Sequence, residues 1–148
     1  MTRAAPPARL KAPRVVAVKR GWRVALGAAS HRLGHRSEWL AAALLMSRGY
    51  QVLGFRLKTR AGEIDILARR GRTLAVVEVK RRATLDLALA ALSAKQYGRL
   101  LAAGRAVLRQ RPSLAGHLLR IDMVALAPGR LPRHRRGIEP FGRGGHDA

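Results

Sequence analysis

Two runs rich in β-branched residues, Ile64 to Ala68 and Leu74 to Val79, lie either side of the sequence RRGR and constrain the fold more than any other feature. Such runs favour strands, and a short link that contains glycine is typical of a β-hairpin. The same region holds Glu63, Asp65 and Glu78, which are three of the eight acidic residues of the chain. The sequence therefore predicts a hairpin that carries a cluster of carboxylates.

The flanking segments predict an α/β fold around this hairpin. Residues Ser37 to Ser47 are apolar nearly all round and predict a buried helix, and Tyr50 to Lys58 alternates as a strand does. Ser93, with a glutamine three residues later, has the form of a capping box that opens a helix through Arg109. Leu118 to Leu126 predicts a last strand. The expected order is αβββαβ, with a mixed sheet flanked by helices.

Both ends of the chain differ in composition from this middle part. Residues 1–36 carry nine Lys or Arg, no acid and three prolines, and residues from 127 onward are rich in Pro, Gly and Arg. Segments of this kind bury little apolar surface. We expect a basic, mostly disordered arm over 1–33, a core domain over 34–127, and a basic tail over 128–148 with a short apolar anchor at Ile138 and Phe141.

The net charge of +22 makes a polyanion the expected partner, with nucleic acid first. Arginine outnumbers lysine 25 to 5, so codon bias or solubility is the alternative explanation of the charge. An anionic membrane surface is a weaker option, because no basic amphipathic helix with an aromatic face is visible. Without cysteine there is no disulfide or thiolate metal site, and no apolar run reaches the length of a membrane span, so a soluble cytoplasmic protein is expected.

The parity of the hairpin decides whether its carboxylates meet. Side chains alternate across a strand, so Glu63 and Asp65 are expected on one face of the first strand. A two- or four-residue loop centred on Arg70 and Gly71 sets Asp65 opposite Val76 and Glu63 opposite Glu78, and all the acids then project together. A three-residue loop would send Glu78 to the other face.

Carboxylates placed this close together destabilise a sheet unless a cation compensates them. Lys80, on the same face as Glu78, is one candidate. A divalent cation is the other, since Mg²⁺ or Mn²⁺ takes oxygen ligands and is typically held by one or two carboxylates. In a basic protein such an ion would meet a phosphodiester and lower the pKa of an attacking water. Lys80 would then lie beside that water and the scissile phosphate.

Each candidate also has an ordinary structural explanation. Glu63 and Glu78 are consistent with surface partners of arginine, and Glu38 is favoured at a helix start by the helix dipole. Lys95, on the first turn of the second helix, either reaches phosphate or is simply solvated. Asp122 is more typical of a structural hydrogen-bond acceptor, so we leave it out of the site. The five histidines show no ligand spacing and are set aside.

The sequence GEIDILA at 62–68, followed by VVEVKRR at 76–82, resembles the signature of the YraN (UPF0102) family of bacterial endonuclease-like proteins. The resemblance extends over roughly residues 34–142. It includes Glu38 ahead of an Ala/Leu helix, RGYQVL at 48–53, RIDMV at 120–124, and the late Ile138 and Phe141. Two positions depart from the family pattern: Ser37 stands where glycine is usual, and Arg56 stands where asparagine is usual.

This resemblance implies the restriction-endonuclease-like core of the PD-(D/E)xK nucleases, in a form close to Holliday-junction resolvases. It implies Glu38, Asp65 and Glu78 as metal ligands, joined by the carbonyl of Val79. It also implies Lys80 as the catalytic lysine. Candidates for substrate contact are Glu63, Arg82 and Lys95.

The expected function is therefore a Mg²⁺- or Mn²⁺-dependent DNA endonuclease acting on branched or structured DNA. Because related resolvases pair to cut two strands, a homodimer belongs to this expectation. One alternative is a non-catalytic nucleic-acid-binding protein with the same fold. Another is an RNA- or ribosome-associated basic protein.

Overall fold

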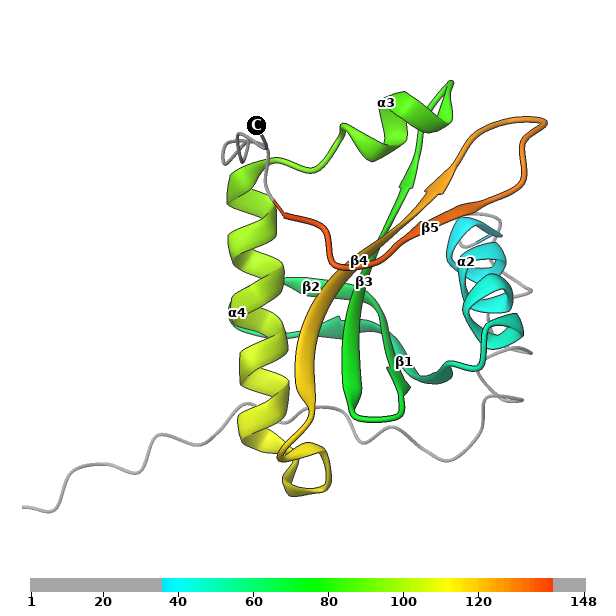
Figure 1. The fold of residues 1–148 in the computed structure, drawn as a ribbon. Coiled ribbons are helices and arrows are strands. Elements are labelled where there is room, and N and C mark those ends of the chain that lie inside the picture. Colours follow the sequence, from blue (N-terminus) through cyan, green and yellow to red (C-terminus); the bar gives the residue numbers. More distant parts are fainter. Residues whose placement is uncertain (1–35, 140–148) are drawn as a thin grey trace, which may run out of the picture.

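The computed structural model describes residues 36–139, which form a five-stranded sheet with helices on both faces (Figure 1). The strand order is β1-β2-β3-β4-β5, so β3 is the central strand. The elements in chain order are α2 (Arg36–Ser47), β1 (Gln51–Lys58), β2 (Glu63–Arg70), β3 (Thr73–Arg81), α3 (Leu85–Leu89), α4 (Ala94–Gln110), a 3-10 turn (Pro112–Leu114), β4 (Leu118–Leu126) and β5 (Arg133–Arg135).

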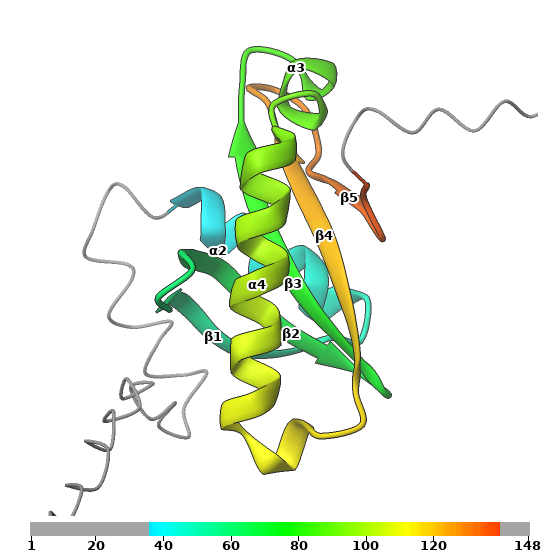
Figure 2. The same ribbon diagram turned by 90° about the vertical axis from the view of Figure 1, so that its left-hand side faces the viewer.

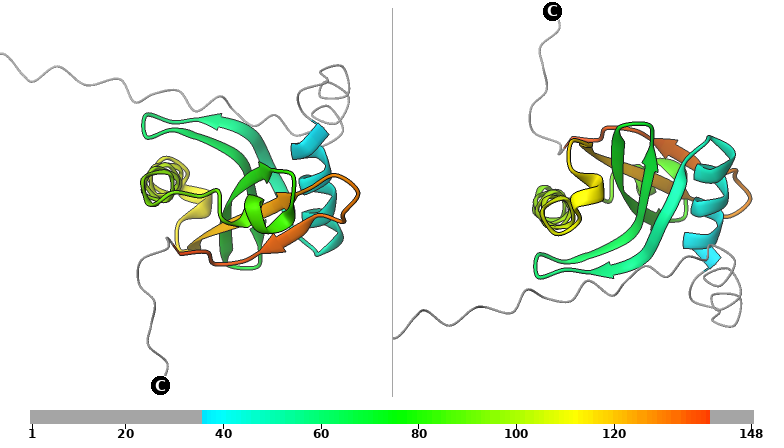
Figure 3. Two further views of the ribbon diagram at one scale, coloured as in Figure 1. Left: turned by 90° about the horizontal axis from the view of Figure 1, so that it is seen from above. Right: turned by 90° about the horizontal axis from the view of Figure 1, so that it is seen from below.

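The sheet separates two apolar clusters, one under each long helix (Figures 2 and 3). On one face, Ala41, Ala42 and Leu45 of α2 are fully buried in a cluster with sheet residues such as Ile66 and Val77. On the other face, α4 packs on a second cluster formed with the alternate sheet residues. Because both faces of the central strand are covered, residues 74–77 of β3 read as a continuous apolar run.

Helix α4 lies very close to the sheet, and Gly104 makes this possible. A methyl group at Gly104 would come within 2.6 Å of a Leu119 side-chain carbon and 2.9 Å of one from Val76. The helix begins at the predicted capping box: Ser93 accepts from the backbone N–H of Gln96, and the Gln96 side chain accepts from that of Ser93. The capping box at Ser93 thus determines where α4 begins, and Gly104 allows its close packing on the sheet.

The connections make the sheet mixed. Strands β1, β2 and β3 are antiparallel neighbours, whereas β3 and β4 are parallel and are joined through α3 and α4. The predicted α/β class and the predicted order of helix, three strands, helix and strand are confirmed. The structure adds the short helix α3 and the edge strand β5 to that order.

The hairpin register differs from the prediction by two residues. Arg70 pairs with Thr73, so the loop consists of Gly71 and Arg72, and Gly71 has a φ of 55°. Continuing this register sets Asp65 level with Glu78, whereas the prediction set Asp65 opposite Val76. The shift leaves parity unchanged, because the pairing moves by an even number of residues. The left-handed Gly71 at the first loop position suits a two-residue turn.

A second correction concerns alternation along β2. Ile64 packs in the cluster under α4, but Ile66 packs in the cluster under α2, although the alternation predicts one face for both. Their partners across β1, Leu57 and Phe55, divide in the same way. Between those two partners lies Arg56, the one non-glycine residue in 36–139 with a positive φ, at 47°. On both strands the side chains therefore change from one face of the sheet to the other at the level of Arg56 and Asp65.

The folded unit continues past the predicted boundary at residue 127. Strand β5 pairs with β4 from Met123 to Ala125, and His134 in β5 is buried. Ile138 packs against the cluster under α4, as expected for an anchor, and its N–H donates to the carbonyl of Ile121. The predicted arm at 1–33 and Phe141 lie outside the described residues. Among residues 36–139, no helix has the length and apolar character needed to cross a membrane.

Candidate functional site

The carboxylate of Asp65 lies at a fork where β2 and β3 part. The ladder between these strands ends at the pair Ile66 and Val77, while β3 continues to Arg81 alongside β4 alone. Beyond the last pair, Oδ2 of Asp65 accepts a 2.8 Å hydrogen bond from the backbone N–H of Val79. The side chain thus satisfies a β3 donor that the β2 backbone no longer reaches.

Glu78 lies close enough to Asp65 at this fork to affect the ionisation of Asp65. Burial raises the pKa of Asp65 to about 7, and the charge of Glu78 and a side-chain hydrogen bond with it act in the same direction. The Val79 N–H opposes this shift, and the charge of Glu38 adds a smaller increase. A carboxyl with such a pKa needs either a proton or a cation to be accommodated.

Lys80 supplies one cation at the fork. Its Nζ lies 3.0 Å from Oε1 of Glu78, and both side chains are largely buried, at 13% and 14% exposure. Residues 78 and 80 are two positions apart on β3, so their side chains lie on the same face of the strand and can contact each other. The predicted grouping of Asp65, Glu78 and Lys80 is therefore present in the structure.

Glu38 approaches the same region from the first turn of α2 and is paired there with Arg56. Nε of Arg56 lies 3.1 and 3.2 Å from the two carboxylate oxygens of Glu38. Arg56 occupies the left-handed position described above, a conformation that asparagine and glycine adopt far more readily. The resemblance places asparagine at this position, and the backbone gives the physical reason.

The donor set at the fork fits a hard cation in part. Asp65 and Glu78 supply two carboxylates, and Mg²⁺ is commonly held by one or two. Within residues 36–139, however, no three His, Asp or Glu side chains are close enough to hold a metal ion together. Glu38, which the resemblance implies as a third ligand, is in contact with Arg56. The role predicted for the Val79 carbonyl stays a prediction, since the contact shown for Val79 is that of its N–H.

The three residues predicted to touch substrate are not gathered at the fork by any contact within the described range. Glu63 is exposed at the start of β2, level with Lys58 of β1. Arg82 is exposed just after β3 and donates to the carbonyl of Arg81. Lys95 is exposed on the first turn of α4. The reversal of side-chain alternation at the level of Arg56 explains why Glu63, contrary to the prediction, does not lie on the same face of the sheet as Asp65.

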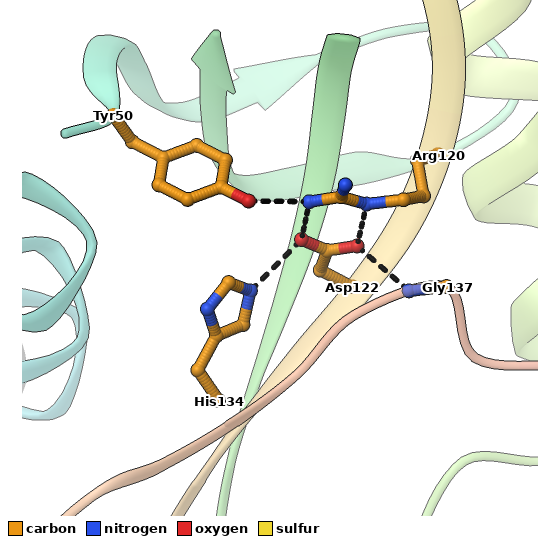
Figure 4. Close-up of polar contacts among 5 residues, drawn as sticks. All are labelled: Tyr50, Arg120, Asp122, His134 and Gly137. Atoms are coloured by element: carbon orange, nitrogen blue, oxygen red, sulfur yellow. Dashed lines mark hydrogen bonds and ion pairs between the residues drawn. The ribbon is translucent and has the colours of Figure 1, made fainter. Parts of the chain in front are cut away.

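A second group of polar residues, centred on Asp122 of β4 and His134 of β5, forms a hydrogen-bond network that was not predicted from the sequence (Figure 4). Asp122 is fully buried and accepts from Arg120 at 2.7 and 2.8 Å, from the Gly137 N–H at 3.0 Å, and bonds Nε2 of His134 at 2.8 Å. Arg120 also donates to the hydroxyl of Tyr50. Burial alone would raise the pKa of Asp122, but these hydrogen bonds outweigh it and lower the pKa to about 2.

Asp122 is therefore a structural acceptor, as the sequence suggested, but the expectation that His134 lies in a tail was wrong. This histidine was assigned to a tail, and it lies instead in a strand of the sheet. No short motif marks it, because its partner Asp122 is 12 positions away and the two meet only through the pairing of β4 with β5.

Comparison with known proteins identifies the family. A family model described as the uncharacterised protein family UPF0102 matches residues 37–126, which include the whole fork. This chain belongs to the UPF0102 family. A UPF0102 protein of Caulobacter vibrioides is 49% identical over 77% of this chain and 91% of its own length. UPF0102 proteins of a Caulobacter species (strain K31) and of Parvibaculum lavamentivorans are 52% and 51% identical, each over 74% of this chain and over 79% and 83% of their own lengths.

Membership in UPF0102 confirms the family resemblance inferred from the motifs at 62–68 and 76–82. The matched segment contains Glu38, Asp65, Glu78 and Lys80 and ends with β4, before β5 begins. The names of these relatives state no activity. What UPF0102 proteins do has to be argued from the fork itself.

Proposed function

We propose that this UPF0102 protein is a metal-dependent endonuclease that hydrolyses phosphodiester bonds in branched or otherwise structured DNA. The observation that carries the proposal is the fork itself, where Asp65, Glu78 and Lys80 lie together on neighbouring strands of a strongly basic protein. A partly buried carboxyl whose pKa is raised, set beside a second carboxylate and a lysine, is typical of catalytic sites.

Each residue has a distinct part in this proposal. Asp65 and Glu78 would hold Mg²⁺ or Mn²⁺, with Glu38 and the Val79 carbonyl completing the ligand set. The bound ion supplies Lewis-acid polarisation of the phosphate and an acidified water. Lys80, held in place by Glu78, would offer its ammonium to the charge that develops on the phosphate. The Val79 N–H fixes the orientation of Asp65 before any substrate arrives.

The topology supports assignment to the restriction-endonuclease-like core. A helix carrying Glu38 precedes three antiparallel strands, and a helical crossover leads to a parallel fourth strand. The acids lie on the first helix, on the second strand and on the third, which is the distribution that the resemblance implies. Fold alone does not define activity, so this argument adds to the fork and does not replace it.

A non-catalytic nucleic-acid-binding protein is the second candidate, and one observation favours it. Arg56 holds Glu38 with two contacts, and within residues 36–139 no third acidic or histidine side chain joins Asp65 and Glu78 in a group that could hold a metal ion. If Arg56 keeps Glu38 when metal and DNA are supplied, the protein would bind DNA without cutting it.

Cleavage assays on four-way junction, flap and linear duplex DNA test the proposal, with 10 mM Mg²⁺ or 1 mM Mn²⁺ and an EDTA control. The variants are Asp65→Asn and Lys80→Ala, and Lys58→Ala is the matched control because Lys58 is an exposed lysine on β1. Metal-dependent cutting by the wild type and by Lys58→Ala, lost by about 10²-fold or more in the other two, supports the nuclease. Tight DNA binding with no cutting in either metal would establish the non-catalytic candidate instead.

A further inference from the structure

A cluster of arginines surrounds Tyr50 at the opposite end of β3 from the fork. Two cavities of about 350 and 450 Å³ share Tyr50, Arg70 and Arg136 in their walls. Arg120 borders the first cavity, and Arg48 and His134 border the second. Among the described residues, no aspartate or glutamate lines either one.

The topology brings these residues together from distant parts of the chain. Arg70 ends β2 at the hairpin turn, Arg120 lies near the start of β4, and Arg136 follows β5. Tyr50 follows α2 and packs in the cluster under that helix. The guanidinium carbons of Arg70 and Arg120 lie 5.7 and 5.9 Å from the centre of the Tyr50 ring. The cluster therefore has a fixed aromatic base, and contacts of this kind hold an arginine in place.

Arg120 is oriented in advance to offer a hydrogen-bond donor. Its Nε and Nη2 are held by Asp122, and Nη2 also donates to Tyr50. Nη1 has no partner among residues 36–139, and it points away from the carboxylate of Asp122 (Figure 4). A guanidinium fixed in this way presents its remaining N–H groups without losing conformational entropy on binding.

The charges at this site are not balanced by acidic side chains within residues 36–139. Asp122 is already engaged by Arg120, His134 and Gly137, so it leaves Arg48, Arg70 and Arg136 without an acidic partner in the described part of the chain. His134, which borders the second cavity, has a fully buried ring whose Nδ1 has no hydrogen-bond partner within the described residues. Buried polar atoms without a partner are uncommon and call for a specific explanation.

We propose that this arginine cluster is a phosphate-binding site, distinct from the fork, in which Arg70, Arg120 and Arg136 hold one phosphate group. Guanidinium groups match phosphate oxygens in geometry and charge, and several of them around a cavity without carboxylates favour a multiply charged anion. The lining is charged rather than apolar, which argues against an uncharged organic ligand. The site does not depend on the proposed cleavage activity.

The phosphate has two possible sources, a nucleic-acid strand or a small phosphorylated molecule, and both present the same oxygens. The strand is compatible with the geometry, because Thr73 at the cavity and Glu78 at the fork lie on one strand, five residues or about 17 Å apart. A bound DNA segment would then be held at two places on the same protein.

The test uses the full chain and the double variant Arg70→Gln with Arg136→Gln, which removes two exposed charges without disturbing Asp122. The matched control is Arg105→Gln with Arg109→Gln, which removes two exposed charges from α4. The first measurement is the ³¹P NMR line width of inorganic phosphate titrated with each protein at constant ionic strength. The second is the fluorescence anisotropy of a labelled junction DNA.

We expect the wild type and the control to bind inorganic phosphate alike, and the cavity variant to bind it at least about 10-fold more weakly. A loss of DNA affinity in the cavity variant several-fold beyond that of the control would assign the phosphate to a nucleic-acid strand. Equal DNA affinities of the two variants would assign it to a small phosphorylated molecule. If the wild type binds no inorganic phosphate, or if both variants lose it equally, the proposed site is wrong. Cutting at the fork is scored separately, so the two proposals fail independently.

Discussion

The Asp65 carboxylate and the Val79 backbone N–H are joined by a 2.8 Å hydrogen bond across the point where β2 and β3 separate. This bond fixes the acid at the mouth of the fork, next to Glu78. The same position is costly for an ionised carboxylate, since burial and the charge of Glu78 raise the pKa of Asp65 to about 7. The fork therefore fixes the orientation of Asp65 and favours a proton or a bound cation at its carboxylate.

Replacing Asp65 with asparagine should stabilise the metal-free protein at pH 8. The folded-state pKa lies above the unfolded value of 3.8, so the wild type loses stability as the pH rises from about 4 through 7. Asparagine carries no charge and can still accept from Val79. We expect a gain of about 1 to 2 kcal/mol in the free energy of unfolding at pH 8, because solvent screening reduces the full effect, and little difference near pH 4. Urea denaturation in EDTA at both pH values measures this, and an equal loss at both would contradict it.

Metal binding should depend on pH through the same carboxyl. A divalent cation competes with the proton on Asp65, so Mn²⁺ should raise the Tm of the wild type more at pH 8 than at pH 6 and should release protons when it binds. Asp65→Asn should lose most of this shift, whereas Asp86→Asn, which changes an exposed acid on α3, should keep it. Thermal denaturation with and without EDTA is the measurement. A shift that is the same at both pH values would exclude Asp65 as a ligand.

Exchanging Arg56 for asparagine should release Glu38 toward the fork. Asparagine accepts the left-handed φ of 47° more readily than arginine, which offsets part of the lost ion pair. We expect a change in stability below about 1 kcal/mol and a several-fold gain in Mn²⁺ affinity. Isothermal titration calorimetry of this variant beside Arg60→Asn, a change at an exposed loop arginine, separates a specific effect from loss of charge. Unchanged metal affinity would show that Arg56 does not restrain Glu38.

Asp122 should be among the most sensitive positions for stability. Its pKa is lowered to about 2, so its contribution is complete above about pH 4 and is lost as the pH falls toward 2. Asp122→Asn leaves Arg120 and His134 without a buried anion and should cost about 3 to 5 kcal/mol at pH 7. Asp86→Asn should change stability by less than about 0.5 kcal/mol. Urea denaturation compares the two, and similar midpoints would mean that the buried network contributes little.

The sequence alone determined most elements of this protein and their order, without the short helix α3 and the edge strand β5. Periodicity, the RRGR link and the capping box at Ser93 all act over a few residues, so they predict the hairpin, the two long helices and the last strand. The carboxylate cluster was also visible, because parity within one hairpin is a local property that survived a two-residue change of register. Asp65, Glu78 and Lys80 could therefore be grouped before any coordinates were known.

Tertiary structure decided what depends on contacts between distant segments. The reversal at Arg56 is seen only where paired residues of β1 and β2 divide between the two apolar clusters, and it separates Glu63 from Asp65. The position of His134 follows from β5 joining the sheet, and the arginines around Tyr50 meet only because four elements end at one place. Local propensity does not encode such long-range contacts, because they arise from the packing of the whole sheet and from the burial of charge within it.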